Sequence, residues 1–174
     1  YSPDGTRIVT ASSDATAAVW DAASGQRLLT LTGHTQDVLA AVYSRDGARI
    51  ATASADGTVI LWDAARGRAL LTLSGHGQVV RSVGFSPDGS AVASAGDDHT
   101  VRLFDAKTGA AQLTIDDRVG GVRSVSFSPD GTRVLFAGGG GAARSYPTRL
   151  EAFFRFGCRV LAGLELTKEV QPYC

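Results

Sequence analysis

Methionine is absent from this chain of 174 residues, which has only two cysteines and two lysines. Because translation begins with methionine, we expect the translation start to lie outside the sequence. Both cysteines, Cys158 and Cys174, are near the C-terminus, which argues against a scaffold held by disulfides distributed along the chain. We therefore expect a fold stabilised by packing, free thiols rather than a disulfide, and a cytoplasmic location. The preference for arginine over lysine is compatible with a bacterial source.

A net charge is also missing, since 17 basic side chains balance 17 acidic ones. Nucleic acids and anionic membranes attract a basic surface, so neither is an expected partner. The sequence contains no apolar run of about 18 residues, the length that indicates a membrane-spanning helix. Aromatic residues make up only 7% of the chain, so valine, leucine, isoleucine and alanine must supply most of the core.

What the chain does contain is a regular internal repeat. The turn sequence Ser-Pro-Asp-Gly, with arginine replacing proline in one copy, recurs at a constant step of 42 residues. Its aspartates are Asp4, Asp46, Asp88 and Asp130, and an aromatic series with the same step is Trp20, Trp62, Phe104 and Tyr146. A repeat without insertions indicates one supersecondary unit copied four times. Such arrays are usually binding surfaces rather than catalysts.

The second unit illustrates the expected secondary structure. Alternating apolar and β-branched residues predict strands over 38–43, 50–54, 58–63 and 69–73. The intervening sequences at 44–47, 55–57 and 66–67 are typical of tight turns. Four short strands cannot bury an apolar face alone, so each sheet must pack on the next. We therefore predict an all-β fold, a partial β-propeller of about four blades with incomplete first and last blades.

These motifs resemble those of the WD-repeat β-propeller family. The resemblance covers residues 1–147 and rests on Trp20-Asp21, Trp62-Asp63, Gly33-His34 and Gly75-His76. The corresponding units are 1–33, 34–75, 76–117 and 118–147. Compared with the family's blades, the first unit begins at its second strand and the fourth lacks its fourth strand. The resemblance therefore implies the C-terminal part of a larger propeller, with missing N-terminal blades among its partners.

In that family, a histidine, a strand serine or threonine, a turn aspartate and the tryptophan share a buried hydrogen-bonded network. The resemblance implies this network in the second unit, with parts of it in the first and third. The implied members are His34, Thr52 or Ser54, Asp56 and Trp62; His76, Ser94 and Asp98; and Asp14 and Trp20. The third unit lacks the tryptophan, and the fourth lacks the histidine, aspartate and tryptophan. The replacing residues are Phe104, Arg118, Gly140 and Tyr146.

A different pattern begins after Pro147. A capping box at 148–151 and the apolar stripe that follows predict a helix, so we expect a C-terminal helical capping tail over 148–174. Docking of this helix to another domain is the alternative. The segments 158–159, 166–169 and 172–174 resemble the tail of large bacterial WD-repeat signalling or effector proteins. That resemblance implies an alternative function, as the sensor half of a switch protein with a nucleotide-binding, caspase-like or kinase module upstream.

No cluster of reactive side chains departs from the repeat, so we expect no enzyme, no cofactor and no metal. Two alternatives are weaker than the repeat interpretation. Asp97, Asp98 and His99 are a set of potential metal ligands, but Asp98 belongs to the implied network. The glycines at 138–141 resemble a phosphate-binding loop, but they coincide with the turn of the fourth unit.

We predict a non-catalytic scaffold that binds a protein or peptide on one propeller face. This face is formed by the Gly-His loops and by the turns between the second and third strands of each unit, such as 55–57, which we call the Asp turns. Four loop side chains on that face have no evident structural duty: Gln36, Gln78, Asp97 and His99. Arg81 and Arg123 share one position on the innermost strand, where they either favour an acidic partner or stay solvated.

Overall fold

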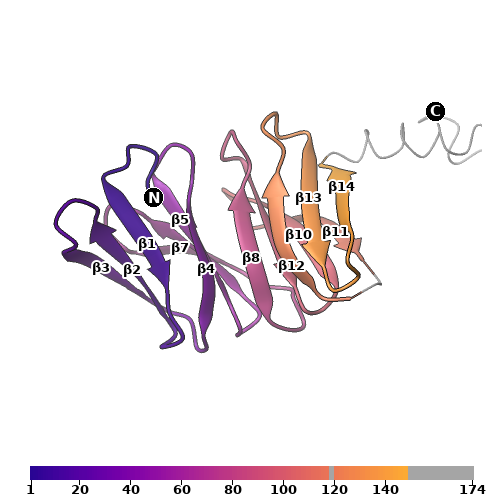
Figure 1. Cartoon of the computed structure of the whole chain (residues 1–174), viewed down its shortest axis with the longest axis horizontal. Helices are drawn as coiled ribbons and strands as arrows, with labels where there is room; N and C mark the ends of the chain where they lie inside the picture. The colour runs from indigo at the N-terminus through magenta and orange to yellow at the C-terminus, as the bar shows by residue number, and fades with distance from the viewer. Residues whose placement is uncertain (118–119, 149–174) are drawn as a thin grey trace, which may run out of the picture.

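The computed structural model describes residues 1–117 and 120–148, which form four antiparallel sheets (Figure 1). The first sheet contains β1 (Arg7–Ala11), β2 (Thr16–Asp21) and β3 (Arg27–Thr32). The second contains β4 (Val38–Tyr43), β5 (Arg49–Ser54), β6 (Val59–Asp63) and β7 (Ala69–Leu73). The third contains β8 (Val80–Phe85), β9 (Ala91–Gly96), β10 (Thr100–Asp105) and β11 (Ala111–Asp116). The fourth contains β12 (Val122–Phe127), β13 (Arg133–Gly138) and β14 (Ala143–Pro147).

Within each sheet, the strands pair in chain order, and the sheets stack side by side in chain order (Figure 1). The first strands of neighbouring sheets contact each other, since β4 contacts β8 and β8 contacts β12. The predicted all-β partial β-propeller is therefore confirmed. The sheets have two ends: one carries the Ser-Pro-Asp-Gly turns, and the other carries the Asp turns and the Gly-His loops.

The Ser-Pro-Asp-Gly turns close through their own side chains. In the second sheet, Ser44 Oγ donates to Asp46 Oδ1 at 2.5 Å and accepts from the Arg49 amide at 2.9 Å. Gly47 adopts a positive φ of 71°, a conformation that glycine enters without a steric cost. The proline position is not needed for these bonds, so Arg45 is tolerated there.

Each space between neighbouring sheets holds a separate apolar core. Trp62 and Ile50 pack against Val19 and Leu31 between the first two sheets. Further cores lie between the second and third sheets, around Phe104, and between the third and fourth, around Phe136. Because each core needs residues from two sheets, no sheet is stable by itself.

Several predictions concern residues outside those described. They are the helical tail from residue 149 onward, the state of Cys158 and Cys174, and the role of Arg118. Within the described ranges, the chain contains no helix with the length and apolar character needed to cross a membrane.

Candidate functional site

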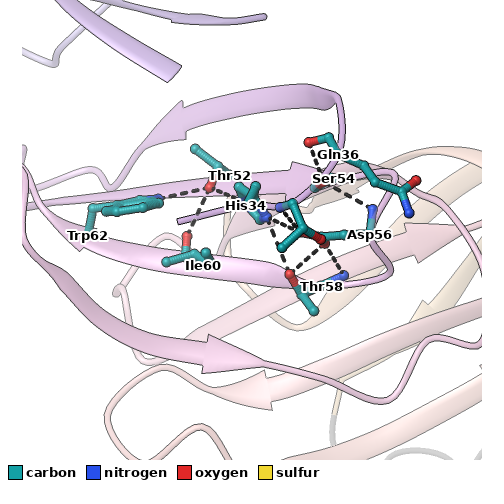
Figure 2. Close-up of polar contacts among 9 residues, drawn as sticks. His34, Gln36, Thr52, Ser54, Asp56, Thr58, Ile60 and Trp62 are labelled. Atoms are coloured by element: carbon teal, nitrogen blue, oxygen red, sulfur yellow. Dashed lines mark hydrogen bonds and ion pairs between the residues drawn. The ribbon is translucent and has the colours of Figure 1, made fainter. Parts of the chain in front are cut away.

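Thr52 joins the polar network of the second sheet (Figure 2). Its Oγ1 accepts the indole N–H of Trp62 at 2.8 Å and lies 2.8 Å from Nε2 of His34. On the other side of the imidazole, Nδ1 of His34 lies 2.9 Å from Oδ2 of Asp56. All four side chains are buried or nearly so, and each of their polar atoms in this chain of contacts has a partner.

Asp56 connects this network to the loop above it. Its carboxylate accepts from the Thr35 amide at 3.0 Å and from the Thr58 hydroxyl at 2.7 Å. Burial alone would raise the pKa of Asp56, but the hydrogen bonds from Thr58, Thr35 and His34 outweigh it and lower the pKa to about 2. The carboxylate is therefore ionised at neutral pH and fixes the start of the Gly-His loop.

The sequence left Thr52 and Ser54 as alternatives, and the structure gives them different contacts. Thr52 lies between the imidazole and the indole, as described above. Ser54 Oγ instead donates to the Gln36 carbonyl at 3.1 Å and accepts from the Asp56 amide at 3.1 Å. Both residues therefore hold this end of the sheet, but only Thr52 contacts His34.

The third sheet repeats the arrangement without an indole. Nδ1 of His76 lies 2.9 Å from Asp98 Oδ1, and Nε2 lies 2.7 Å from Ser94 Oγ. Burial lowers the pKa of His76, although Asp98 acts in the opposite direction. The imidazole is therefore neutral at pH 7, with its proton on Nδ1, and it accepts from Ser94 at Nε2. Phe104, with no N–H group, packs in the apolar core.

The outer two sheets contain only fragments of the network. In the first, Trp20 Nε1 donates to Thr10 at 2.9 Å, while Asp14 accepts from Thr16 at 2.7 Å. In the fourth, Phe136 occupies the repeat position of Thr52 and stacks on Tyr146, with ring centroids 5.5 Å apart. The fourth sheet has thus replaced a polar pair with an aromatic one.

Three of the six candidate contact residues are exposed on the loops of one end: Gln36, Gln78 and His99. These loops adjoin each other, since a Cβ at Gly57 in the second Asp turn would lie 3.4 Å from the carbonyl oxygen of Gln78. His99 adopts a positive φ of 65° at the place where Gly57 has 83°. Among the described residues, none of these three side chains forms a hydrogen bond.

Asp97 has a structural duty that the sequence did not reveal. Arg81 donates to it from Nε at 3.0 Å and from Nη2 at 2.6 Å. Hydrogen bonds from Arg81, and the nearby charge of Arg123, lower the pKa of Asp97. The interpretation of Asp97 as a side chain without a structural partner was wrong. Arg81 is likewise paired, which leaves Arg123 as the exposed cation of this cluster.

The two arginines lie at a β-bulge that the second, third and fourth sheets share, and the second sheet has Leu39 there. The register between first and second strands shifts between Val80 and Ser82, and again between Val122 and Ser124. Arg81 and Arg123 lie in these bulges. A bulge redirects a side chain, and here it occurs next to the Asp-turn end of the sheet.

The described residues contain no group of three or more His, Cys, Asp or Glu side chains placed to hold a metal ion. Sequence reasoning missed two other residues, Arg7 and Arg49, which reach from one sheet into the next. The sequence signal was an arginine at the same repeat position in the first and second units, 42 residues apart. Ala91 stands at that position in the third unit.

The model of the WD domain, G-beta repeat, matches residues 1–21, 25–63, 67–105 and 112–145. The chain belongs to the WD-repeat family. Each complete WD repeat begins on the last strand of one sheet and ends on the third strand of the next, so the repeats link the sheets covalently. WD-repeat domains generally mediate protein interactions and are generally not catalytic. No curated protein matches the chain.

Proposed function

We propose that this WD-repeat chain is a non-catalytic interaction module, and that a protein or peptide binds the end carrying the Gly-His loops and Asp turns. One observation carries the proposal. Ionised aspartates, Asp56 and Asp98, accept hydrogen bonds from backbone amides of the Gly-His loops and so fix these loops. The side chains of Gln36, Gln78 and His99 remain exposed at the same end. A rigid loop with free polar side chains loses little conformational entropy on binding.

The backbone at His99 supports the same conclusion. A non-glycine residue at positive φ carries a steric cost, and glycine occupies this place in the second and fourth Asp turns. Ala15 has a φ of 67° at this place in the first Asp turn, so the turn needs neither glycine nor an imidazole. The exposed ring of His99 is therefore available for binding.

Charge indicates the nature of the contact near the inner strands. Arg81 is neutralised by Asp97, whereas Arg123 is exposed beside that pair. An exposed guanidinium without an ion-pair partner of its own among the described residues complements a carboxylate. We therefore propose an acidic segment of the partner next to Arg123.

Site-specific photo-crosslinking tests the proposal. A benzophenone side chain replaces Gln36, Gln78 or His99 in turn, and the matched control replaces Arg45 on the Ser-Pro-Asp-Gly turn at the other end. We expect one partner to crosslink at the three test positions and not at Arg45. Equal crosslinking at both ends, or at Arg45 alone, would overturn the proposed face.

A further inference from the structure

A cavity of about 820 Å³ lies between the third and fourth sheets, at the end opposite the Gly-His loops. Ala91, Phe127, Gly131 and Thr148 line it, together with Asp88 and Asp130. This volume lies in the range of pockets that hold small ligands. The corresponding space between the second and third sheets shows what such a cavity accommodates.

Arg49 extends into that neighbouring space. Its guanidinium donates to the carbonyl oxygens of Ala106 at 3.1 Å and Gly89 at 2.6 Å. It also lies over the ring of Phe85, 5.3 Å from the centroid, in a cation–π contact. The chain thus places its own arginine between these two sheets, on two carbonyl groups and an aromatic face.

The interface between the first and second sheets repeats one of these contacts. Arg7 donates to the carbonyl oxygen of Ala64 at 3.2 Å, a partner 57 residues further on, as Ala106 is for Arg49. Two successive interfaces therefore contain a guanidinium at the same repeat position. The bond to this carbonyl group is thus common to two interfaces, while Arg49 adds the Gly89 carbonyl and the Phe85 ring.

Ala91 interrupts this series at the third interface. The three groups that would receive an arginine there are nevertheless retained. Counting 42 residues from Phe85, Gly89 and Ala106 gives Phe127, Gly131 and Thr148, and all three line the cavity. The Thr148 hydroxyl already donates to the Gly131 carbonyl at 2.9 Å, but a carbonyl oxygen accepts two hydrogen bonds.

The charge of the cavity also favours a cation. Hydrogen bonds from Ser86 and Ser128 lower the pKa of Asp88 and Asp130, respectively, to about 2, so both carboxylates are ionised at neutral pH. Among the described residues, the lining contains no arginine, lysine or histidine. The cavity therefore retains the acceptors, the aromatic face and the negative charge, and lacks only the cation.

We propose that this cavity binds a guanidinium group, supplied as the arginine side chain of a partner peptide. The guanidinium would occupy the place that Arg49 fills one interface earlier, on Phe127 and the carbonyl oxygens of Gly131 and Thr148. The site is distinct from the proposed Gly-His face, because it lies at the other end of the sheets. Its failure would leave the proposed function unaffected.

The test uses two capped tripeptides, Ala-Arg-Ala and Ala-citrulline-Ala, titrated into the full chain by NMR and calorimetry. Citrulline has nearly the shape of arginine without its charge. We expect the arginine peptide to bind at least about tenfold more tightly, because charge-assisted hydrogen bonds are stronger than neutral ones. Its addition should shift the amide signals of Gly131 and Thr148.

Filling the cavity provides the decisive variants. Ala91→Arg should restore the internal contact and weaken the arginine peptide at least about tenfold. Ala91→Met fills the same space without charge, so the site can still be tested if the arginine variant does not fold. Ala23→Arg is the matched control, since it adds the same side chain on an exposed turn of the first sheet. Equal affinity for both peptides, no binding, or binding that survives either filling variant would overturn the proposal.

Discussion

At the scale of single residues, the polar network shows why threonine and serine are not equivalent in successive sheets. Thr52 has two buried partners, an imidazole and an indole, whereas Ser94 has only an imidazole because Phe104 lacks an N–H. The consequence of losing the hydroxyl therefore depends on the aromatic residue ten positions later.

Thr52→Val should accordingly be more destabilising than Ser94→Ala. Valine keeps the shape of threonine but leaves both Trp62 Nε1 and His34 Nε2 without their partner. Each buried polar group without a partner costs about 1–3 kcal/mol of unfolding free energy. Urea denaturation of the two variants measures the difference. Equal losses would show that the indole bond contributes nothing.

The buried imidazole of His76 predicts a pH dependence. Burial lowers its pKa below the usual 6.5, so the folded state binds this proton less readily than the unfolded state. Stability should therefore fall as the pH decreases below about 6.5, and this loss should end below the folded pKa. Burial raises the pKa of Asp98, but the contacts with His76 and Thr100 outweigh burial, so the net pKa is lowered. Stability should therefore fall a second time below about pH 3.8, as this carboxylate becomes protonated.

Unfolding free energies between about pH 7 and pH 5, with NMR titration of the His76 ring, measure the first loss. His76→Gln removes the ionisable group and should remove this part of the slope. A His76 ring that titrates above the usual value for histidine would contradict the assignment.

At the scale of elements, arginine side chains that cross between sheets supplement the apolar cores. Arg49 connects β5 to two turns of the next sheet, through Gly89 before β9 and Ala106 directly after β10. Arg133 has the same repeat position, but it donates to Ser145 within its own sheet, at 2.7 Å and 2.9 Å. The same residue type thus has an intersheet role in one place and a local role in another.

Arg49→Ala should lower the unfolding free energy by about 2 kcal/mol, because it removes two hydrogen bonds and a cation–π contact in a partly buried position. Arg133→Ala, at an exposed position, should cost less than half of this. Thermal and urea denaturation of both variants measure the difference. Comparable losses would mean that the intersheet contact is no stronger than a surface bond.

The strands of the second unit could be predicted from sequence because their alternation and turn residues are local signals. β5 begins at Arg49, one residue before the predicted start, and β6 begins at Val59, one residue after it. The Arg81–Asp97 pair could not be predicted, since a bulge redirects Arg81 toward a turn 16 residues away. The cavity beside Ala91 could not be predicted either, because the significance of alanine there depends on the intersheet contacts that Arg49 makes at the same repeat position.

At the scale of the whole molecule, each sheet is stabilised by its neighbours. Ala93, on the third sheet, packs against the fourth and is 0% exposed. Leu135 holds the same repeat position on the fourth sheet and is 48% exposed. The described part of the chain thus leaves an apolar position of the last sheet accessible to solvent.

We therefore expect the 174-residue chain to self-associate as its concentration rises. Leu135→Asp places a charge on the open face and should shift the chain toward monomer, as sedimentation would show. The matched control is Leu28→Asp on the first sheet, which is 42% exposed. A chain that is monomeric at all concentrations and unfolds cooperatively would contradict this expectation.

We infer that binding and folding use separate side chains at one end of the propeller: exposed Gln36, Gln78 and His99 bind, and the buried network supports them. The most direct measurement compares partner affinity and unfolding free energy for the triple variant Gln36→Ala, Gln78→Ala, His99→Ala. We predict a loss of affinity of at least about tenfold, with stability within about 0.5 kcal/mol of the unchanged chain. Unchanged affinity, or a variant that unfolds, would contradict the account.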